Sequence, residues 1–356
     1  MMRRLSAARA ACLCGVLLSC RTETDAQRRS VLTEFRAAAV DQGWLLAHFN
    51  RAGAIVLRPE TGARRDMPTA PGYRIYQFAS SASGSCLAFS VDAYALTPGM
   101  AGGSIYVLDR NGLRGSAEGF FTVIKGLAVD PGCTKVSIDG VYQEVDAGGS
   151  PRKAARAGLF YTDLPPGGGT VRLVSRLDDV HAYLTPTGVS DDVFEASWSA
   201  DGKTLAYSVG GAIYAYDVAA AKSRLLVTGT VPAWSPDGKW IGYRGPDNAP
   251  MLFDPVSRQS QSLHEGAHCL WSIKWSPDSK FAIFTQPDWS GVAFIACRLR
   301  DRATAAFYRS GGLQFREDRF AWVTRPLLEA LLAPGARLDD QQHGGSRGGS
   351  ATMPQQ

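Results

Sequence analysis

The chain has little of several things that would assign a function at once. Seven cysteines in 356 residues are too few for a disulfide-built scaffold, and no Cys-x-x-Cys pair suggests a zinc module. A formal charge of +5 is too small to indicate nucleic-acid binding. No apolar run reaches the ~20 residues that span a bilayer as a helix. The chain also lacks a phosphate-binding P-loop and the separate α/β domain that carries the nucleophile of serine hydrolases.

What is present indicates a folded, turn-rich body. Hydrophobic residues make up 45% and aromatic residues 10% of the chain, which excludes a disordered protein and allows a sizeable core. Glycine (38) and proline (19) together exceed their usual share. The excess predicts many turns and therefore a β-rich fold.

The first 20 residues have the layout of an export signal. Arg3, Arg4 and Arg9 precede a short apolar stretch from Ala10 to Ser19, which is too short to cross a bilayer. The stretch ends in Leu-Leu-Ser-Cys20, which resembles a bacterial lipobox whose cysteine receives lipid. We expect a signal peptide over residues 1–19 and lipid attachment at Cys20, with a plain secretory signal as the alternative.

Removal of this leader changes the charge and the cysteine count. Three of the 38 basic residues leave, so 35 remain against 33 acidic residues and the net charge becomes +2. In an oxidising compartment the cysteines of the body can form one or two disulfides, or they can be small buried side chains. The pairing is not readable from the sequence. The four cysteines are Cys86, Cys133, Cys269 and Cys297.

A repeat runs through the chain. Three segments nearly coincide, and their tryptophans, Trp198, Trp234 and Trp275, are 36 and 41 residues apart. Each segment reads Trp-Ser-(Ala/Pro)-Asp-(Gly/Ser)-Lys and is followed by two apolar, alternating stretches that predict strands. Weaker copies begin near Gln42, Ser80 and Val129, the last with one residue inserted. A stretch at Glu317–Trp322 resembles part of the motif without a further strand pair.

The motif predicts a tight turn between two antiparallel strands. Proline presets φ, aspartate bonds back to nearby amides and glycine accepts a positive φ. The turn-forming pairs are Asp201 and Gly202, Asp237 and Gly238, and Asp278 with Ser279. The preceding tryptophans are large enough to fill the wedge between neighbouring sheets. A period of about 36–48 residues with four short strands is that of a propeller blade.

The motif Trp-Ser-Pro-Asp-Gly-Lys, followed by a strand of the form Ile-Tyr-x-x-Asp, resembles the WD40-like (PD40) repeat of TolB-type β-propellers. The similarity covers about residues 42–323 and is strongest from 194 to 300. It implies an all-β propeller and specifies the fold rather than a function. Only about 20 residues separate Cys20 from the first predicted strand, so we expect no counterpart of the α/β domain of TolB, and the resemblance does not imply TolB's role.

We therefore predict a single all-β propeller of six four-stranded antiparallel blades over residues 41–323, with seven as the alternative count if residues 31–40 contribute. The C-terminal strands at 313–323 should close the ring on the first blade, since an open ring exposes two sheet edges. Residues 20–40 form the tether and N-terminal segment, with 21–30 as a polar tether. We expect a short helix over 324–333 and a flexible tail over 334–356.

The sharpest chemical motif is His264-Glu-Gly-Ala-His268, which fits the H-E-x-x-H pattern of zinc proteases. That chemistry requires a helix, whereas the motif lies where the repeat demands a loop and contains Gly266. We interpret it as incidental. Weak zinc binding by His264 and His268, with Cys269 as a third ligand, is the alternative.

Other polar groups have weaker signals. An acidic loop could hold calcium or a polar ligand, although its spacing fits no known calcium loop; its residues are Asp178, Asp179, Asp191 and Asp192, with His181 and Glu195 nearby. Arg152, Lys153 and Arg156 form a small basic patch that is typical of a solvated loop. We interpret the repeated tryptophans and turn aspartates as structural.

The sequence thus predicts an exported, lipid-anchored propeller that acts as a non-catalytic binding or scaffold module for an envelope protein or peptide. We expect no catalytic residue, cofactor, metal or nucleic acid, a monomer, and a location at the outer membrane facing the periplasm, or free in the periplasm. Two alternatives remain: a hydrolase or lyase with a site dispersed over the central channel, and a metal or small-molecule sensor using the acidic loop.

Overall fold

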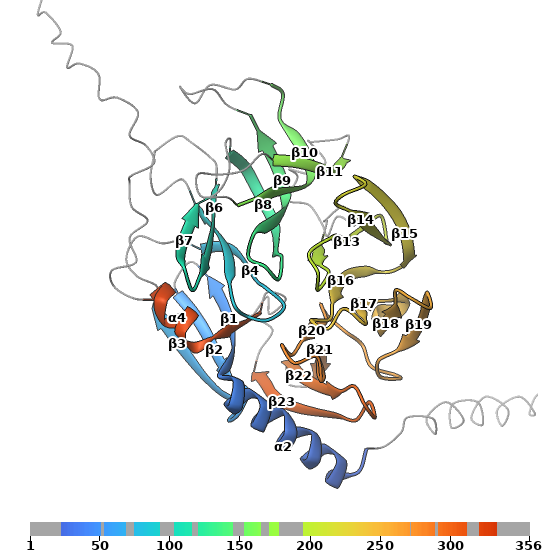
Figure 1. Cartoon of the computed structure of the whole chain (residues 1–356). Coiled ribbons are helices and arrows are strands. Elements are labelled where there is room, and N and C mark those ends of the chain that lie inside the picture. Colours follow the sequence, from blue (N-terminus) through green and yellow to red (C-terminus); the bar gives the residue numbers. More distant parts are fainter. Residues whose placement is uncertain are drawn as a thin grey trace, which may run out of the picture.

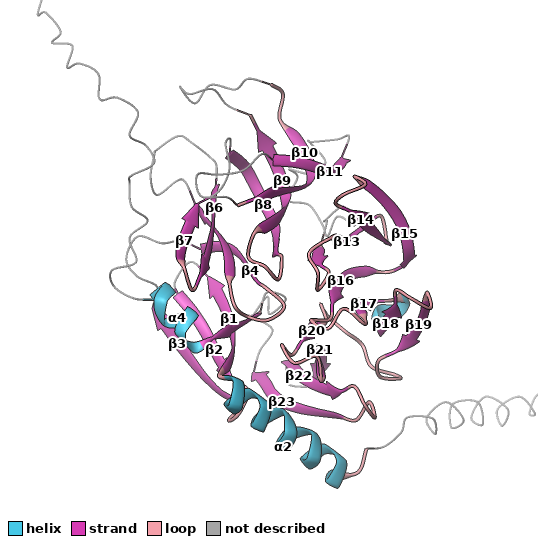
Figure 2. Ribbon diagram, viewed as in Figure 1, coloured by secondary structure: helices cyan, strands magenta, loops and turns pink. Residues whose placement is uncertain are grey.

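The structure is a computed structural model, and it describes residues 23–50, 53–68, 75–92, 103–115, 120–144, 153–164, 171–177, 195–270, 272–288, 291–311 and 320–332. These residues form a ring of β-sheets with helices at its edge (Figures 1 and 2). The predicted all-β propeller is confirmed.

Six four-stranded antiparallel blades make up the ring, so the alternative count of seven is wrong. The blades, each in spatial order, are β24 (Ala321–Thr324), β1 (Trp44–Asn50), β2 (Gly53–Arg58) and β3 (Ala63–Pro68); β4 (Ile75–Ser80), β5 (Leu87–Asp92), β6 (Gly103–Asp109) and β7 (Gly112–Gly115); β8 (Phe120–Val129), β9 (Lys135–Gln143), β10 (Arg156–Asp163) and β11 (Val171–Leu177); β12 (Ala196–Trp198), β13 (Thr204–Val209), β14 (Ala212–Asp217) and β15 (Lys222–Thr228); β16 (Thr230–Trp234), β17 (Ile241–Arg244), β18 (Pro250–Asp254) and β19 (Gln259–Ser262); and β20 (Lys274–Trp275), β21 (Phe281–Asp288), β22 (Gly291–Arg298) and β23 (Thr304–Gly311). We number them blades 1 to 6 in this order. Blades 2 and 3 are joined into one sheet by a single pair, Gly103 with Phe121.

The ring closes by joining the two ends of the chain. Strand β24 pairs antiparallel with β1, from Trp44 opposite Thr324 to Ala47 opposite Ala321. It is the innermost strand of blade 1, and it pairs with an edge of β1 that would otherwise be exposed. The predicted closure by the C-terminal segment is confirmed, although strand is described only from Ala321 onward.

The core is divided among the seams between blades. Six clusters of buried apolar side chains are present, and each lies between two neighbouring blades. Within a strand, alternate side chains therefore enter different clusters: Leu205 and Tyr207 pack against blade 3, whereas Ala206 packs against blade 5. Blade strands consequently read as continuous buried runs, as in β9 and β13.

The helix α2 (Asp25–Gln42) replaces most of the expected polar tether. Thr24 and Gln27 form a capping box at its N-terminus, and Gly43, at φ +63°, ends it in the left-handed conformation. Val31, Phe35 and Ala39, spaced four apart, are buried in the seam between blades 6 and 1. Residues 25–30 of the expected tether thus form the first turns of this helix, and its buried face begins at Val31.

A second helix, α4 (Arg325–Leu332), follows the closing strand directly. Its Leu327 and Leu328 are buried with Phe78 and Leu108 in the seam between blades 1 and 2. Strands β24 and β1 are the one innermost pair not joined by a hairpin, so α2 enters and α4 leaves the ring at this break. A short 3-10 turn, η2 (Pro246–Asn248), lies between β17 and β18.

Candidate functional site: the loop face of the propeller

The two ends of the blade strands differ in how their connections are built. Because successive strands run antiparallel, the first-to-second and third-to-fourth connections of a blade fall on one face, and all others fall on the opposite face. We call the first the turn face, defined by the hairpin turns 81–86, 130–135, 199–204, 235–240 and 276–281. The opposite side is the loop face, to which 210–211, 245–249 and 263–273 belong.

On the turn face, the repeat motif forms the same hydrogen-bond network in each of blades 4 to 6. In blade 4, the Ser199 hydroxyl donates to Asp201 Oδ1 at 2.6 Å and accepts from the Thr204 amide at 3.0 Å. Asp201 Oδ1 also accepts from the Lys203 amide at 3.1 Å, and Gly202 adopts φ +66°. Ser235 with Asp237 and Gly238, and Ser276 with Asp278, repeat the arrangement. These residues close turns.

Asp201 and Asp237 are held as carboxylates by this network. The hydrogen bond from Ser199 lowers the pKa of Asp201 below its ordinary value. Partial burial acts to raise the pKa of Asp237, but hydrogen bonds from Ser235 and Lys239 outweigh it and the pKa is lowered. Both shifts result from turn formation.

The motif tryptophans lie inside the seams. Trp198 packs on Leu159 and Tyr161 of blade 3, and its ring centroid is 6.0 Å from that of Tyr161. Trp234 is buried against blade 4, and Trp275, 5% exposed, packs against blade 5, where its indole N–H donates to the Ala233 carbonyl at 2.8 Å. These aromatics are wedges between blades and form no exposed ligand surface.

Blade 3 shows a copy of the turn that sequence comparison had misaligned. Asp130 occupies the position of the motif serine without any inserted residue, since its amide donates to the Lys135 carbonyl as Ser199 does to Thr204. Its carboxylate accepts from the amides of Thr134 and Lys135, both at 2.6 Å. One aspartate thus replaces the serine–aspartate pair of the other turns.

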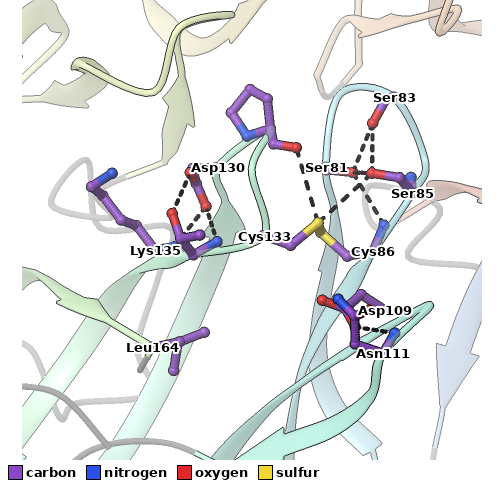
Figure 3. Close-up of a disulfide and its surroundings, with 12 residues drawn as sticks. Ser81, Ser83, Ser85, Cys86, Asp109, Asn111, Asp130, Cys133, Lys135 and Leu164 are labelled. Carbon is purple, nitrogen blue, oxygen red and sulfur yellow. Dashed lines mark hydrogen bonds between the residues drawn. A yellow bond between two sulfur atoms is a disulfide. The ribbon is translucent and has the colours of Figure 1, made fainter. Parts of the chain in front are cut away.

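A disulfide joins the turns of blades 2 and 3 (Figure 3). Cys86 directly precedes the second strand of blade 2, and Cys133, at φ +59°, holds the position of the motif glycine in blade 3. Their bond crosses the seam between the blades, beside the hydroxyls of Ser81 and Ser85. Of the open pairings, the structure contains this one.

The other two cysteines of the body, Cys269 and Cys297, are not joined in a disulfide and are buried in the seam between blades 5 and 6. Burial raises the pKa of the Cys297 thiol to about 12, and its Sγ lies 3.8 Å from the Leu263 carbonyl oxygen. A thiol in this state is not a nucleophile at neutral pH. Cys269 is 0% exposed, so it is unavailable as a third surface ligand beside His268.

On the loop face, the H-E-x-x-H stretch is a loop between β19 and β20, and not a helix. Gly266 adopts φ +74°, which is incompatible with the helical turn that aligns two histidines in zinc proteases. His268 Nδ1 lies 3.0 Å from the Asp247 carbonyl oxygen, and Glu265 is exposed. Across the described residues, no three His, Cys, Asp or Glu side chains are grouped so that they could hold a metal ion.

The loop 263–273 is nevertheless fixed from three sides. The Cys269 amide donates to the Asn248 carbonyl of blade 5 at 2.7 Å, and the Leu270 amide donates to Thr285 of blade 6 at 2.9 Å. Arg244 reaches the Leu270 carbonyl at 3.1 Å and the Thr230 hydroxyl at 3.1 Å. The exposed groups of this loop are therefore presented on a backbone whose position is set by the ring.

The remaining predicted residues are placed only in part. Asp178, Asp179, Asp191 and Asp192 lie outside the described residues, in the connection from β11 to β12, whose two ends meet the loop face. Cys20 and Arg152 also lie outside them. The segment Gly344–Gly348 fits the G-x-S-x-G pattern of serine-hydrolase nucleophile turns, was not among the predicted sites, and lies outside the described residues as well. Lys153 pairs with Glu144 at 2.7 Å, and Arg156 lies over the Tyr142 ring.

Comparisons with known proteins agree with the fold. No family model matches the chain. No curated protein matches it either. Among solved structures, TolB from Acinetobacter baumannii is similar with a TM-score of 0.48 and 14% identity, over 75% of this chain and 66% of that one, so the chain spans just under two thirds of its length.

Two further structures are similar. A putative TolB from Agrobacterium tumefaciens gives a TM-score of 0.46 and 17% identity over 74% of this chain and 88% of that one. A chain of a nidogen–laminin complex gives 0.50 and 10% identity over 79% and 98%. At these identities the likeness concerns the fold alone. In fold, the chain is a six-bladed β-propeller.

Proposed function

We propose that the protein is a lipid-anchored, non-catalytic binding module of the bacterial cell envelope, and that it holds a protein or peptide partner on its loop face. The observation that carries the proposal is the difference between the two faces. On the turn face the innermost connections are similar hydrogen-bonded turns that serve the fold, whereas the connections of the loop face repeat no motif and vary in length, from 210–211 to 263–273. Such variable loops on a rigid frame are where binding residues concentrate.

The loop 263–273 supports this proposal most directly. Its backbone is fixed by blades 5 and 6, and its tip exposes Glu265 and His268. A preorganised surface of this kind loses little conformational entropy when a partner docks. The loop is therefore suited to contact a partner. Cys297 does not suggest catalysis, because its thiol is buried and its pKa is raised.

The test compares two positions of one blade. A photo-crosslinking residue is placed at Glu265 on the loop face or, as the matched control, at Val256, which is 90% exposed in the β18–β19 turn on the turn face. In cells, we expect a discrete crosslinked envelope protein from position 265 only. Crosslinking from position 256 alone would contradict the proposal, because the partner would then lie on the turn face. Hydrolase or lyase turnover by the purified protein would contradict the non-catalytic role.

The anchor has a separate test. Among the described residues, none of the helices is both long and apolar enough to cross a membrane. We assign membrane attachment to lipid on Cys20, because the preceding residues Leu-Leu-Ser resemble a lipobox. Replacing Cys20 by alanine should move the protein from the membrane fraction to the soluble fraction, and unchanged membrane association in this variant would refute lipidation.

A further inference from the structure

The chain is fixed to the ring almost immediately after the proposed lipid-bearing cysteine. Glu23 is the first described residue, and its side chain is only 11% exposed. Its carboxylate accepts hydrogen bonds from the backbone amide of Thr304 and from the Thr304 hydroxyl, the latter at 2.8 and 2.9 Å. Thr304 begins β23, so the N-terminal segment is attached to blade 6 before α2 begins.

The rest of α2 is held along the same rim. Arg298, whose side chain is 6% exposed, donates to the Ser30 hydroxyl at 3.0 Å and to Glu34 at 2.5 Å. Phe35 is fully buried against Phe281 and Phe307. The helix therefore runs as a fixed part of the outer rim over blades 6 and 1 (Figure 1).

The covalent distance from the lipid is short. Two residues, Arg21 and Thr22, separate Cys20 from Glu23, and three residue steps span at most about 11 Å when fully extended. A free tether over residues 21–30 would let the propeller rotate over the membrane. Attachment at Glu23 removes that freedom.

We propose that the rim formed by α2 and the β22–β23 turn is the surface that rests on the bilayer, and that it contacts acidic lipid headgroups. This rests on the lipid anchor of the proposed function. The headgroup contacts are assigned to Arg28, Arg29 and Arg300, three exposed arginines on this rim.

The charges of the rim suit this role. The side chains of Arg28 and Arg300 are 56% and 66% exposed, although Arg28 lies 3.8 Å from Glu23 and Arg300 lies 2.7 Å from Glu34. A guanidinium has five N–H donors, so each retains donors for a phosphate after its carboxylate contact. The same rim also exposes Asp25, Asp41 and Asp301, so the three arginines are individual headgroup contacts that add to the lipid anchor.

The experiment measures how close two sites lie to the lipid headgroups. A fluorescent label is placed at Ala26→Cys, exposed on α2, or at Ala219→Cys, exposed in the β14–β15 turn across the ring. The full lipidated protein is reconstituted into vesicles of phosphatidylethanolamine and phosphatidylglycerol that contain a headgroup spin label. We expect at least threefold stronger quenching at position 26. Equal quenching of both labels on membrane-bound protein would overturn the proposal.

Two variants separate its parts. Glu23→Ala should lengthen the free tether and lower the quenching at position 26 toward that at 219, while Cys20 still holds the protein on the vesicle. Arg29→Glu with Arg300→Glu should lower it in phosphatidylglycerol vesicles, whereas Arg224→Glu, exposed on β15, should not. If neither Glu23→Ala nor the double arginine variant changes the quenching at position 26, the proposed orientation is refuted. If instead Cys20→Ala leaves membrane binding unchanged, lipidation itself fails, and fractionation shows this independently of quenching.

Discussion

The inner turns and the seams between blades are stabilised differently in blades 4 to 6 and in blades 1 to 3. In blades 4 to 6, each inner turn is closed by its own serine and aspartate, and a tryptophan fills each seam. In blades 2 and 3 the serine–aspartate pair of the motif is reduced or absent, and a disulfide joins the two inner turns. At blade 1 the turn is missing, and two helices cover the adjoining seams. Where the repeat motif is missing, contacts between segments that are distant in the sequence stabilise the turns and seams instead.

The largest expected effect is at the ring break. Phe35→Ala removes a fully buried ring that contacts Phe281, Phe307 and Trp322. We expect it to lower the free energy of unfolding by about 3–5 kcal/mol, measured by denaturant titration. Val40→Ala, on the same helix but 62% exposed, is the control and should cost less than about 0.5 kcal/mol. Equal effects of the two would show that α2 is not part of the core.

The disulfide gives the next effect. Cys86→Ala with Cys133→Ala should destabilise the protein by about 2–4 kcal/mol, because the bond closes a loop with a sequence separation of 47. A reductant should lower the denaturation midpoint of the wild type and leave that of the double variant unchanged. If the reductant affects both proteins alike, the seam between blades 2 and 3 does not depend on this bond.

The motif turns should make stability depend on acid pH. The pKa values of Asp201 and Asp237 are lowered in the folded state, so their stabilisation is present above their ordinary pKa, near 3.8, and is lost as pH falls through the folded-state pKa. Asp201→Asn with Asp237→Asn should cost about 1 kcal/mol at pH 7. The difference from the wild type should vanish in unfolding titrations toward pH 2.5. A constant difference would assign the effect to packing.

The smallest effect concerns the inner turn of blade 6, which has serine at the position of the motif glycine. Ser279 adopts φ +58°, where a side chain is disfavoured, but its hydroxyl accepts from the Asp237 amide of the neighbouring blade at 2.9 Å. Ser279→Gly should change stability by less than about 1 kcal/mol, because relief of backbone strain offsets the lost hydrogen bond. Ser279→Ala keeps the strain and should be the less stable variant in thermal unfolding. Both variants lose the hydrogen bond, so the reverse order would show that the positive φ of residue 279 costs less than the added chain entropy of glycine.

The same contrast explains what the sequence could and could not predict. The serine–aspartate–glycine turns and buried tryptophans are local, so three near-identical copies were enough to predict the fold and its closure. Asp130 was misplaced because one carboxylate does the bonding of two side chains, a chemical equivalence that residue identity does not reveal. The disulfide depends on which turns meet across a seam, and that follows from blade geometry. The helix α2 did leave a signal, in its Thr24–Gln27 capping box and the spacing of Val31, Phe35 and Ala39.

For the candidate site the sequence was less informative. Partner contacts on a propeller come from single residues on separate connections, which share no local pattern. The motif that looked most like chemistry, His264 to His268, depends on a helix that Gly266 prevents. Strand direction, by contrast, places this loop and the ends of the acidic connection on one face. Strand topology therefore points to one face of the ring as the binding surface, whereas the sequence motifs do not.

The pairing of β24 with β1 also fixes an order of assembly. A nascent chain that has reached residue 311 can complete blades 2 to 6, but its first blade has three strands and an unsatisfied edge from Trp44 to Ala47. That edge stays unpaired until the last strand is made. Because the two strands are separated in sequence by almost the entire propeller, their pairing is expected to form late and slowly. A stop codon just before Ala321 would therefore remove only a short terminal segment, yet it would leave a bare strand edge that favours aggregation.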